Sequence, residues 1–474
     1  MITDLEKRCL SRLWNNPPDL KQAEQNGLSS QAAKILSGMK LDFDTHGELD
    51  LTRIYSDLGE LGFASVLAEI SSPPETADIG IETFPEMSLD DLTAALGSTI
   101  KNDDQNKGIT FLACLAAYSL DSQLNLVFNS TSSSGKSYIT LEVAAYFPKE
   151  DVISIGHCSP TAFFHDKSDF DEAVGGYRLD LSRKIIIFLD QPQTLLLQYL
   201  RPLLSHDQRE ISIRITDKSQ KHGLRTKNVF IKGFPTVIFC TANLKLDEQE
   251  ATRAFLLSPQ TDPEKIRAAI TAKILKESDP EKFRELIESD PMRKTLKRRI
   301  LAVKAAGIED IKIDCPSAVS ALFLERRGAL KPKHMRDVHR FMSLMKACAL
   351  LNLWTRKIEG RTLFANGDDF EMAFRLWEPI AESQELNLPP YVFQFFKEVI
   401  EAAFNGEGLS RGQIIQKHLA VYSRPVPDWQ LRQQILPMLE SAGLIIQDSD
   451  PKDSRRKLVW PTKNYSESRC GGEI

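Results

Sequence analysis

The chain has 474 residues, of which 42% are hydrophobic and 26% are charged, as in soluble globular proteins, and this length suits about three domains. Its net charge of −5 excludes a protein that coats nucleic acid through bulk charge, so any such contact must come from local basic patches. The seven cysteines are scattered and form no CxxC pair, which argues against a disulfide framework or a zinc site. Met1–Leu10 is polar and no apolar run reaches the length of a membrane span, so we expect a cytoplasmic protein without membrane contacts.

Five blocks follow one another along the sequence. Residues 1–75 have helical spacing and predict a helical N-terminal domain, and the proline-containing stretch 76–104 is typical of a linker. Residues 105–260 alternate short apolar strands with helices, which predicts a parallel sheet with crossover helices. Residues 261–387 are helical and charged, and residues 388–465 combine three helical segments with a strand-like tail. The expected fold class is therefore α/β, with helical blocks on either side of the sheet domain.

A loop of small residues follows the first core strand. Leu124–Phe128 is a buried-strand pattern, and a helix pattern begins at Tyr138. Between them lies Ser130–Ser137, which ends in Gly-Lys-Ser, and this context predicts a phosphate-binding loop for ATP. Small residues let backbone N–H groups surround a phosphate, and the helix N-terminus adds a positive dipole. The candidate ATP-binding residues are Ser130, Ser132, Ser133, Ser134, Gly135, Lys136, Ser137 and Tyr138.

Two side chains of this loop have expected chemical roles. Lys136 would reach the β- and γ-phosphates of ATP, and Ser137 would supply a hydroxyl ligand to Mg²⁺. Ser130 stands where the motif has its first glycine, so it must tolerate a tight turn. The competing interpretation is a serine-rich loop that contains Gly-Lys-Ser by coincidence.

A second apolar strand, Lys184–Asp190, ends in an acid. This pattern predicts that Asp190 faces the Mg²⁺ held by Ser137, whereas the alternative is an ordinary turn aspartate. Gln191 follows, and a glutamine can orient water but cannot take its proton. Three explanations remain open: a slow or switch-like ATPase, a base from elsewhere such as Glu210, or an engineered substitution that traps ATP.

A β-hairpin is predicted between Asp190 and the next core strand. Glu210–Ile215 and Asn228–Lys232 both alternate apolar and polar residues, and the turn between them, 217–227, is basic. Such a tip can grip DNA phosphates, which carry no sequence information. The alternative is a solvated edge hairpin protected by lysines. The candidate DNA-binding residues of the tip are Lys218, Lys221, His222, Arg225 and Lys227.

Three polar side chains beyond the hairpin lie next to predicted strands or helices. Asn243 follows the core strand Thr236–Cys240, and Arg253 precedes another apolar segment. Arg336 lies at the start of an amphipathic helix pattern in the helical block. The alternatives are a turn asparagine at 243, a surface ion pair at 253, and Lys333 or Arg340 in the place of Arg336.

The C-terminal block has the order of a winged helix. Three helices are expected over Tyr391–Phe404, Ser410–Leu419 and Asp428–Ser441, with Ser410 and Asp428 as N-caps. Two short strands, Leu444–Gln447 and Lys457–Trp460, enclose a charged loop. Winged helices bind duplex DNA or serve as protein-contact modules, and both readings stay open. Arg455 and Arg456 are the candidate DNA contacts of the wing.

Together, residues 105–385 resemble the AAA+ helicases whose pore hairpin precedes the sensor strand, of which the minichromosome maintenance helicases are best known. The resemblance is greatest to the shorter versions of mobile elements and phages, often found beside a primase. It implies an AAA+ parallel sheet with a helical lid, and a hexameric, ATP-driven helicase acting on single-stranded or forked DNA. It also implies a primase or other replication protein as a partner.

The same resemblance assigns roles to the polar residues. Asn243 becomes the sensor that faces the γ-phosphate, Arg253 the finger that reaches a neighbour's ATP, and Arg336 the lid arginine that contacts the phosphates. Gln191 departs from the glutamate that most AAA+ ATPases have at this position. Two other functions stay open: an ATP-switched DNA-binding initiator or loader, and an AAA+ scaffold in a defence or regulatory assembly.

Overall fold

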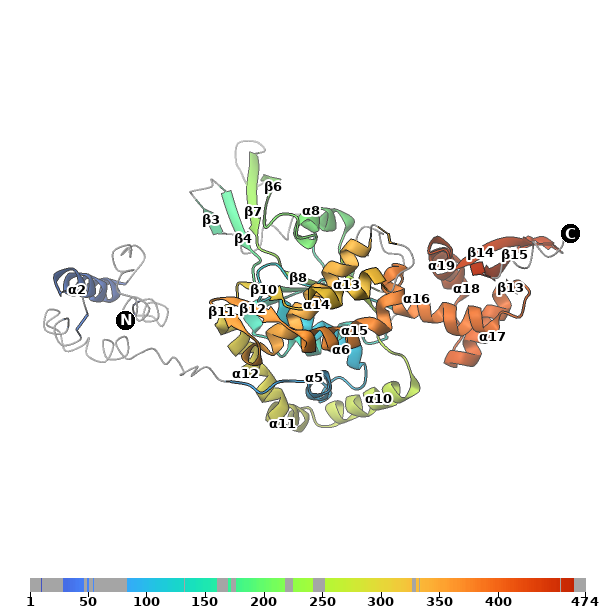
Figure 1. Cartoon of the computed structure of the whole chain (residues 1–474), viewed down its shortest axis with the longest axis horizontal. Coiled ribbons are helices and arrows are strands. Elements are labelled where there is room, and N and C mark those ends of the chain that lie inside the picture. Colours follow the sequence, from blue (N-terminus) through green and yellow to red (C-terminus); the bar gives the residue numbers. More distant parts are fainter. Residues whose placement is uncertain are drawn as a thin grey trace. The chain divides into compact units, whose positions relative to one another are not determined.

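The computed structural model (Figure 1) describes residues 10, 29–46, 49–50, 54, 83–131, 133–159, 169–171, 176–217, 225–241, 252–325, 330–331, 333–451 and 453–463. The chain divides into two compact units, Met1–Thr83 and Phe84–Ile474. In the first unit, helix α2 (Ser30–His46) includes a buried carboxylate, Asp42, which accepts a hydrogen bond from the Asp50 backbone at 2.8 Å. Most of the predicted helical domain, residues 1–75, lies outside the described residues.

A five-stranded parallel sheet forms the centre of the second unit. Its strands are β1 (Leu126–Asn129), β2 (Val152–Ile155), β5 (Ile185–Phe188), β8 (Thr236–Thr241) and β9 (Phe255–Leu257). They lie in the order β2-β5-β8-β1-β9, and each neighbouring pair is parallel. Strands of continuous apolar residues are expected in such a sheet, because both of its faces are covered. The predicted α/β class, with a parallel sheet and crossover helices, is confirmed.

Side chains of the sheet alternate between two hydrophobic clusters, one on each face. Phe128 belongs to the cluster that contains α6 (Asp104–Ala116) and α7 (Lys136–Ala144). Val127 belongs to the opposite cluster, where the leucines of α8 (Thr194–Leu204) cover the sheet. The sheet is therefore fixed from both sides, and the residues that follow its strands are held in defined positions.

The segment expected to be a linker belongs largely to the core. Helix α5 (Leu89–Leu96) begins with a capping box between Ser88 and Asp91, and its leucines join the same cluster as α6. The boundary between the two units falls after Thr83, so the predicted linker 76–104 differs from the structure over residues 84–104. Pro85 favoured a linker over this stretch, but a proline could not show that the residues after it are buried.

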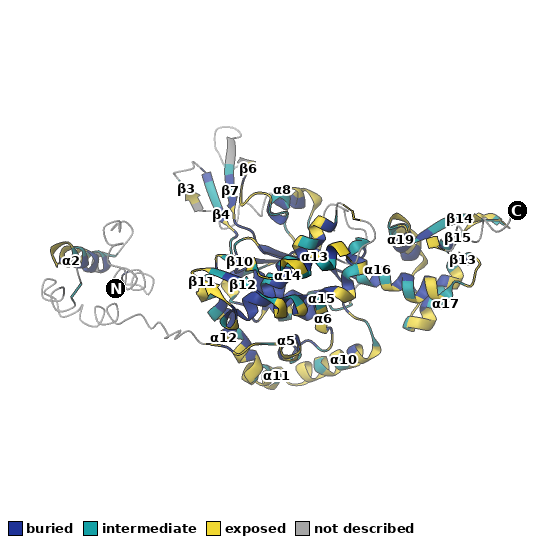
Figure 2. Ribbon diagram, in the orientation of Figure 1, coloured by how far each residue is buried: buried dark blue, intermediate teal, exposed yellow. Residues whose placement is uncertain are grey.

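The block predicted as helical and charged contains the expected helices and one small sheet. The helices are α10 (Pro263–Ser278), α11 (Pro280–Ser289), α12 (Pro291–Ala306), α13 (Pro316–Ser320), η5 (Ala321–Glu325), α14 (His334–Leu351), η6 (Leu353–Thr355) and α15 (Gly367–Glu385). The unpredicted strands are β10 (Asp310–Ile313), β11 (Ile358–Glu359) and β12 (Thr362–Ala365). Figure 2 shows that α10 and α11 are mostly exposed, whereas α14 packs in the core.

The predicted hairpin is present as part of a second, four-stranded sheet, which extends away from the parallel one (Figure 1). Strands β6 (Glu210–Asp217) and β7 (Arg225–Lys232) pair antiparallel, and β3 (Asp169–Asp171) and β4 (Gly176–Asp180) extend the sheet beside β7. Ile211 and Ile213 are buried whereas Ser212 and Arg214 are exposed, as a period-2 pattern requires.

The C-terminal block has the predicted order of helices and strands. Its helical segments are α16 (Pro390–Phe395), η7 (Phe396–Glu401), α17 (Arg411–Tyr422), α18 (Asp428–Gln430), η8 (Leu431–Ile435) and α19 (Leu436–Ser441). Its strands β13 (Leu409–Ser410), β14 (Ile445–Asp450) and β15 (Asp453–Pro461) form one antiparallel sheet. Ser410 caps α17 as predicted, but Asp428 is the first residue of α18 and its N-cap is Pro427.

Among the described residues, no helix is both long and apolar enough to cross a membrane. The short 3-10 helix η3 (Lys149–Asp151) leads directly into β2.

Candidate functional site

The phosphate-loop residues follow β1 at the carboxyl-terminal edge of the sheet. The left-handed backbone that the turn requires falls on Ser133 (φ 62°) and Gly135 (φ 96°). Ser130 is buried and does not take a positive φ, which explains why a serine is tolerated where the motif has glycine. Ser132 lies outside the described residues. The loop therefore turns at its end, next to the N-terminus of α7.

Lys136, the first residue of α7, turns its ammonium into the loop. Its Nζ donates to the carbonyl oxygens of Ser130 at 2.9 Å and Thr131 at 2.7 Å. Burial lowers the pKa of this ammonium. Within the described part of the chain, Thr131 Oγ1 and Ser134 Oγ are buried and make no hydrogen bond. Buried hydroxyls without partners beside a buried cation fit a phosphate group well.

Ser137 and Tyr138 extend the site along α7. Burial raises the pKa of the Cys240 thiol of β8, and hydrogen bonds from Thr140 and Ser137 act in the opposite direction, so Ser137 lies beside β8. The Tyr138 hydroxyl donates to the carbonyl oxygen of Thr99 at 2.8 Å, which joins α7 to the segment after α5. Tyr138 thus lies at the border of the loop rather than inside it.

Asp190 and Gln191 follow β5 at the same edge of the sheet. Asp190 is exposed, and its Oδ1 accepts a hydrogen bond from the Gln191 backbone at 2.8 Å. The Thr241 hydroxyl, at the end of β8, donates to Gln191 Oε1 at 3.2 Å. The end of β8 therefore touches both halves of the site, with Cys240 near α7 and Thr241 at Gln191.

A carboxylate and a hydroxyl on one sheet edge are the oxygen ligands that Mg²⁺ prefers. Asp190 and Ser137 fit that ion, and both follow strands of the same parallel sheet. The predicted sensor, Asn243, lies outside the described residues, although Thr241 shows that its strand ends at this edge. Glu210, the alternative base, is the first residue of β6 in the other sheet.

The two predicted arginines lie at the opposite, amino-terminal edge of the parallel sheet. Arg253 precedes β9, which runs parallel to β1, and its Nε donates to Ser205 Oγ at 2.6 Å. Arg336, near the start of α14, donates to the Thr252 hydroxyl. About six extended residues separate the two edges of the sheet, or roughly 20 Å. Both arginines are therefore far from the phosphate loop of their own chain.

Arg336 thus lies away from the phosphate loop of its own chain. The start of α14 packs against the amino-terminal end of β9, where Arg340 Nη1 donates to the carbonyl oxygen of Ala254 at 2.5 Å. Arg340 is buried and paired with Asp337, and Lys333 immediately precedes the helix. The two alternatives to Arg336 thus lie at the same edge.

The basic hairpin residues are only partly described. Lys218, Lys221 and His222 lie outside the described residues. Arg225 and Lys227 belong to β7 and not to the turn, because the two strands pair as far as Asp217 and Arg225. This corrects the predicted turn 217–227, which is shorter because its ends continue the ladder.

The wing arginines lie on β15, which pairs with β14. Arg455 and Arg456 are exposed, and Arg456 Nε is 3.3 Å from the carboxylate of Asp453.

Ser205 and Thr252, which hold the two arginines of the amino-terminal edge, were missed by the sequence interpretation. No local signal marks them, since each contact joins residues 48 or 84 positions apart.

No protein-family model matches the chain, and a search of curated proteins finds no match. Among solved structures, a Cytophaga hutchinsonii protein assigned as an ATPase aligns with TM-score 0.34 and 11% identity, over 60% of this chain and 84% of that one. The SCCmec type IV Cch active helicase aligns with TM-score 0.33 and 10% identity, over 81% and 72%. The apo C-terminal region of NrS-1 aligns with TM-score 0.24 and 12% identity, over 80% and 77%. At these TM-scores, the fold class rests on the strand order of the chain itself.

Proposed function

We propose that this chain is an ATP-dependent DNA helicase or translocase that acts as a ring of identical copies. The observation that carries the proposal is the separation of two half-sites on one sheet. Lys136 and Asp190 lie at its carboxyl-terminal edge, whereas Arg253 and Arg336 lie at its amino-terminal edge. Neither half is complete alone, and head-to-tail contact between copies brings unlike edges together.

In this proposal each chain binds ATP at its own phosphate loop. Lys136 and the loop N–H groups would hold the phosphates, and Ser137 and Asp190 would hold Mg²⁺, which would supply positive charge at the phosphates. Asn243 faces the γ-phosphate, and Gln191 orients the attacking water through its amide. The Thr241 hydroxyl bonded to Gln191 Oε1 supports this, because that bond leaves the amide in a defined orientation.

Arg253 and Arg336 would serve the ATP of a neighbouring copy. An arginine supplied from another chain stabilises charge in the transition state of phosphoryl transfer. Each of the two is held by a hydroxyl, on Ser205 and Thr252, and Thr252 and Arg253 are adjacent in sequence. Two arginines held by hydroxyls on one edge suit phosphate groups that are presented across an interface.

The hairpin β6–β7 would contact single-stranded or forked DNA through Lys218, Lys221, His222, Arg225 and Lys227. A two-stranded extension with a basic tip supports phosphate contacts, which are independent of sequence. The C-terminal block, as a winged helix with Arg455 and Arg456 on its wing, would bind duplex DNA. The biological setting we propose is replication of a mobile element or phage, by a hexamer that works with a primase.

A second function is favoured by one observation, the glutamine at position 191. An amide cannot accept the proton of the attacking water, so the chain would then be an ATP-switched DNA-binding initiator or loader with little hydrolysis. In that case the ring holds ATP, and the C-terminal block determines where on DNA it binds.

Steady-state ATP hydrolysis, with and without single-stranded DNA, separates the two functions. Comparison with Lys136→Ala and Gln191→Glu shows whether turnover uses this site and whether a carboxylate at 191 raises it. Turnover that rises with DNA and vanishes in Lys136→Ala supports the motor. Negligible turnover in the wild type, with robust DNA-stimulated turnover in Gln191→Glu, favours the switch. The absence of DNA affinity in every nucleotide state would exclude both.

A further inference from the structure

We infer that Ser205 is a positioning residue for Arg253, and that helix α8 links the chain's own phosphate site to the arginine it presents to a neighbour. The inference rests on the proposed role of Arg253 in a neighbour's ATP site. It adds a residue and a route of coupling between neighbouring sites, which the motifs of the sequence do not contain.

The contact itself suits a positioning role. Arg253 Nε donates to Ser205 Oγ at 2.6 Å, and both residues are half-buried. A bond through Nε fixes the plane of the guanidinium without itself occupying the two terminal nitrogens. Those nitrogens are the pair that can make parallel hydrogen bonds to phosphate oxygens. Ser205 therefore orients the arginine and does not compete with a nucleotide for it.

The backbone at Ser205 makes this anchor rigid. Ser205 is the C-cap of α8, and its N–H donates to the carbonyl oxygen of Arg201 at 3.0 Å. The C-terminus of a helix carries partial negative charge, which favours a guanidinium beside it. The Ser205 hydroxyl and the C-terminal end of α8 thus both favour the Arg253 guanidinium at this position.

The other end of α8 lies at the chain's own phosphate site. The helix begins at Thr194, three residues after Gln191, and ends at Leu204. Eleven residues at about 1.5 Å each span roughly 16 Å, which is close to the distance between the two sheet edges. One helix therefore connects the segment that follows Gln191 with the residue that holds the arginine.

Packing couples α8 to the sheet along its length. Leu196, Leu200 and Leu203 are buried against the sheet in one hydrophobic cluster with β5 and β8. Close-packed interiors transmit displacement, because side chains cannot compress. A change at Gln191 on ATP binding would shift Ser205 and hence Arg253. Arg336 donates to Thr252 and not to Ser205, so the link through α8 applies to Arg253.

The test uses the full chain in DNA-stimulated ATP hydrolysis, with Ser205→Ala, Ser205→Thr and Arg253→Ala. Ser205→Ala should lower kcat about tenfold, the effect of losing one hydrogen bond to a charged group, with an unchanged melting temperature. Ser205→Thr keeps the hydroxyl and should retain wild-type turnover. In the Arg253→Ala background, Ser205→Ala should cause no further loss, because the two residues act as one unit.

A mixing experiment shows whether the effect is exerted on a neighbour. Lys136→Ala chains have no working phosphate site but retain Ser205 and Arg253. Adding them to Ser205→Ala chains should raise turnover per Ser205→Ala chain toward the wild-type value.

The outcomes separate this inference from the proposed function. If Ser205→Ala lowers kcat equally in the Arg253→Ala background, or if mixing does not raise turnover, Ser205 does not act through Arg253. A loss in Arg253→Ala without a loss in Ser205→Ala overturns the inference alone. Full activity of Arg253→Ala overturns the role of Arg253, and the inference with it.

Discussion

At the scale of single residues, the phosphate site depends on where strain and buried charge are placed. Positive φ angles fall on Ser133 and Gly135, and the Lys136 ammonium is buried among loop carbonyls. Both features are costly unless a ligand or the surrounding structure compensates for them. The serine-rich composition of the loop therefore has a physical reason, since small side chains leave the backbone open to a phosphate.

His206 gives a prediction at this scale. This residue follows α8, and its backbone has φ 56°. The centroid of its ring lies 4.7 Å from that of Phe234 and 5.5 Å from that of His339. Burial, and then the charge of His339, lowers the pKa of His206 to about 4, although Asp121 acts in the opposite direction. Between about pH 6.5 and 4 the unfolded chain binds a proton that the folded chain does not. The free energy of unfolding should therefore fall as pH drops through this window.

Urea unfolding at pH 7.5, 6.5 and 5.5 measures that fall. His206→Asn removes the titrating group, and asparagine tolerates the left-handed backbone. The variant should lose less stability than the wild type between pH 7.5 and 5.5. Identical pH dependence in both proteins would show that folding does not lower the pKa of His206.

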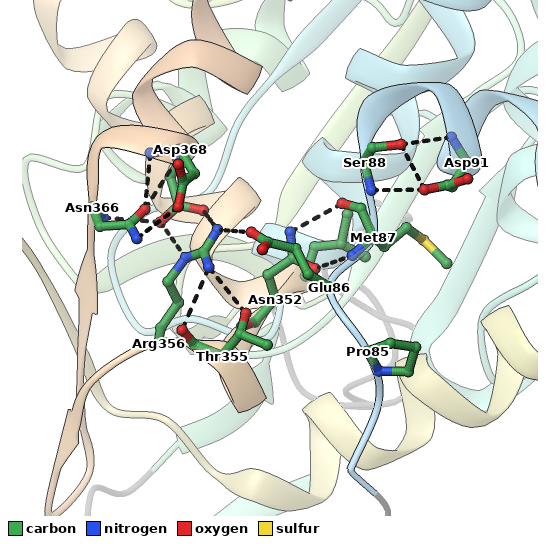
Figure 3. Close-up of polar contacts among 12 residues, drawn as sticks. Pro85, Glu86, Met87, Ser88, Asp91, Asn352, Thr355, Arg356, Asn366 and Asp368 are labelled. Carbon is green, nitrogen blue, oxygen red and sulfur yellow. Dashed lines mark hydrogen bonds and ion pairs between the residues drawn. The ribbon is translucent and has the colours of Figure 1, made fainter.

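At the scale of elements, the segment before α5 is fastened to the core by buried polar groups. Arg356 Nε donates to Asp369 at 2.9 Å and its Nη2 donates to Glu86 at 2.7 Å, while Asn352 bonds both backbone groups of Met87 (Figure 3). Asp369 also caps α15 together with Asn366. This network joins residues 86–87, the segment 352–356 after α14, and the start of α15. The residues after Thr83 are therefore attached to the core and do not form a linker.

This network gives a prediction with a matched control. Arg356→Met leaves the buried Asp369 without its cation, so the free energy of unfolding should fall by about 3–5 kcal/mol. Arg361→Met removes the exposed ion pair with Glu309 and should cost less than about 1 kcal/mol. Chemical denaturation of the two variants beside the wild type compares these losses. Equal effects would mean that the buried network does not stabilise the unit.

At the scale of the whole molecule, the parallel sheet separates phosphate-binding groups from arginines. Because β9 runs parallel to β1, a residue before β9 and a residue after β1 must lie at opposite edges. A single chain thus presents two different half-sites. Head-to-tail assembly is the arrangement that makes both of them useful, and it closes into a ring when the rotation between copies permits.

Complementation between two inactive variants tests this arrangement. Lys136→Ala lacks the phosphate contact and Arg253→Ala lacks the arginine, so each alone should hydrolyse ATP poorly. A mixture contains interfaces that join an intact loop from one variant to an intact arginine from the other, and should regain part of the wild-type turnover. A mixture no more active than its components would indicate that Arg253 acts within its own chain or not at all.

The sequence by itself determined the features that depend on local pattern. Apolar runs of strand length identified β1, β5 and β8, and period-2 alternation identified the hairpin. The Gly-Lys-Ser loop predicts the phosphate site from the same kind of local pattern. These signals are local because a buried strand or a tight turn constrains the residues within it. The interpretation of Asp190 and Gln191 also depended on a local pattern, because both were recognised by their place at the end of an apolar strand.

The tertiary structure decided what depends on the direction and pairing of distant segments. It moved Arg336 to the edge away from its own loop, placed residues 84–104 in the core, and extended the hairpin into a four-stranded sheet. It also revealed Ser205 as the partner of Arg253. Such contacts join residues tens of positions apart, and sequence periodicity carries no information about which distant surfaces meet.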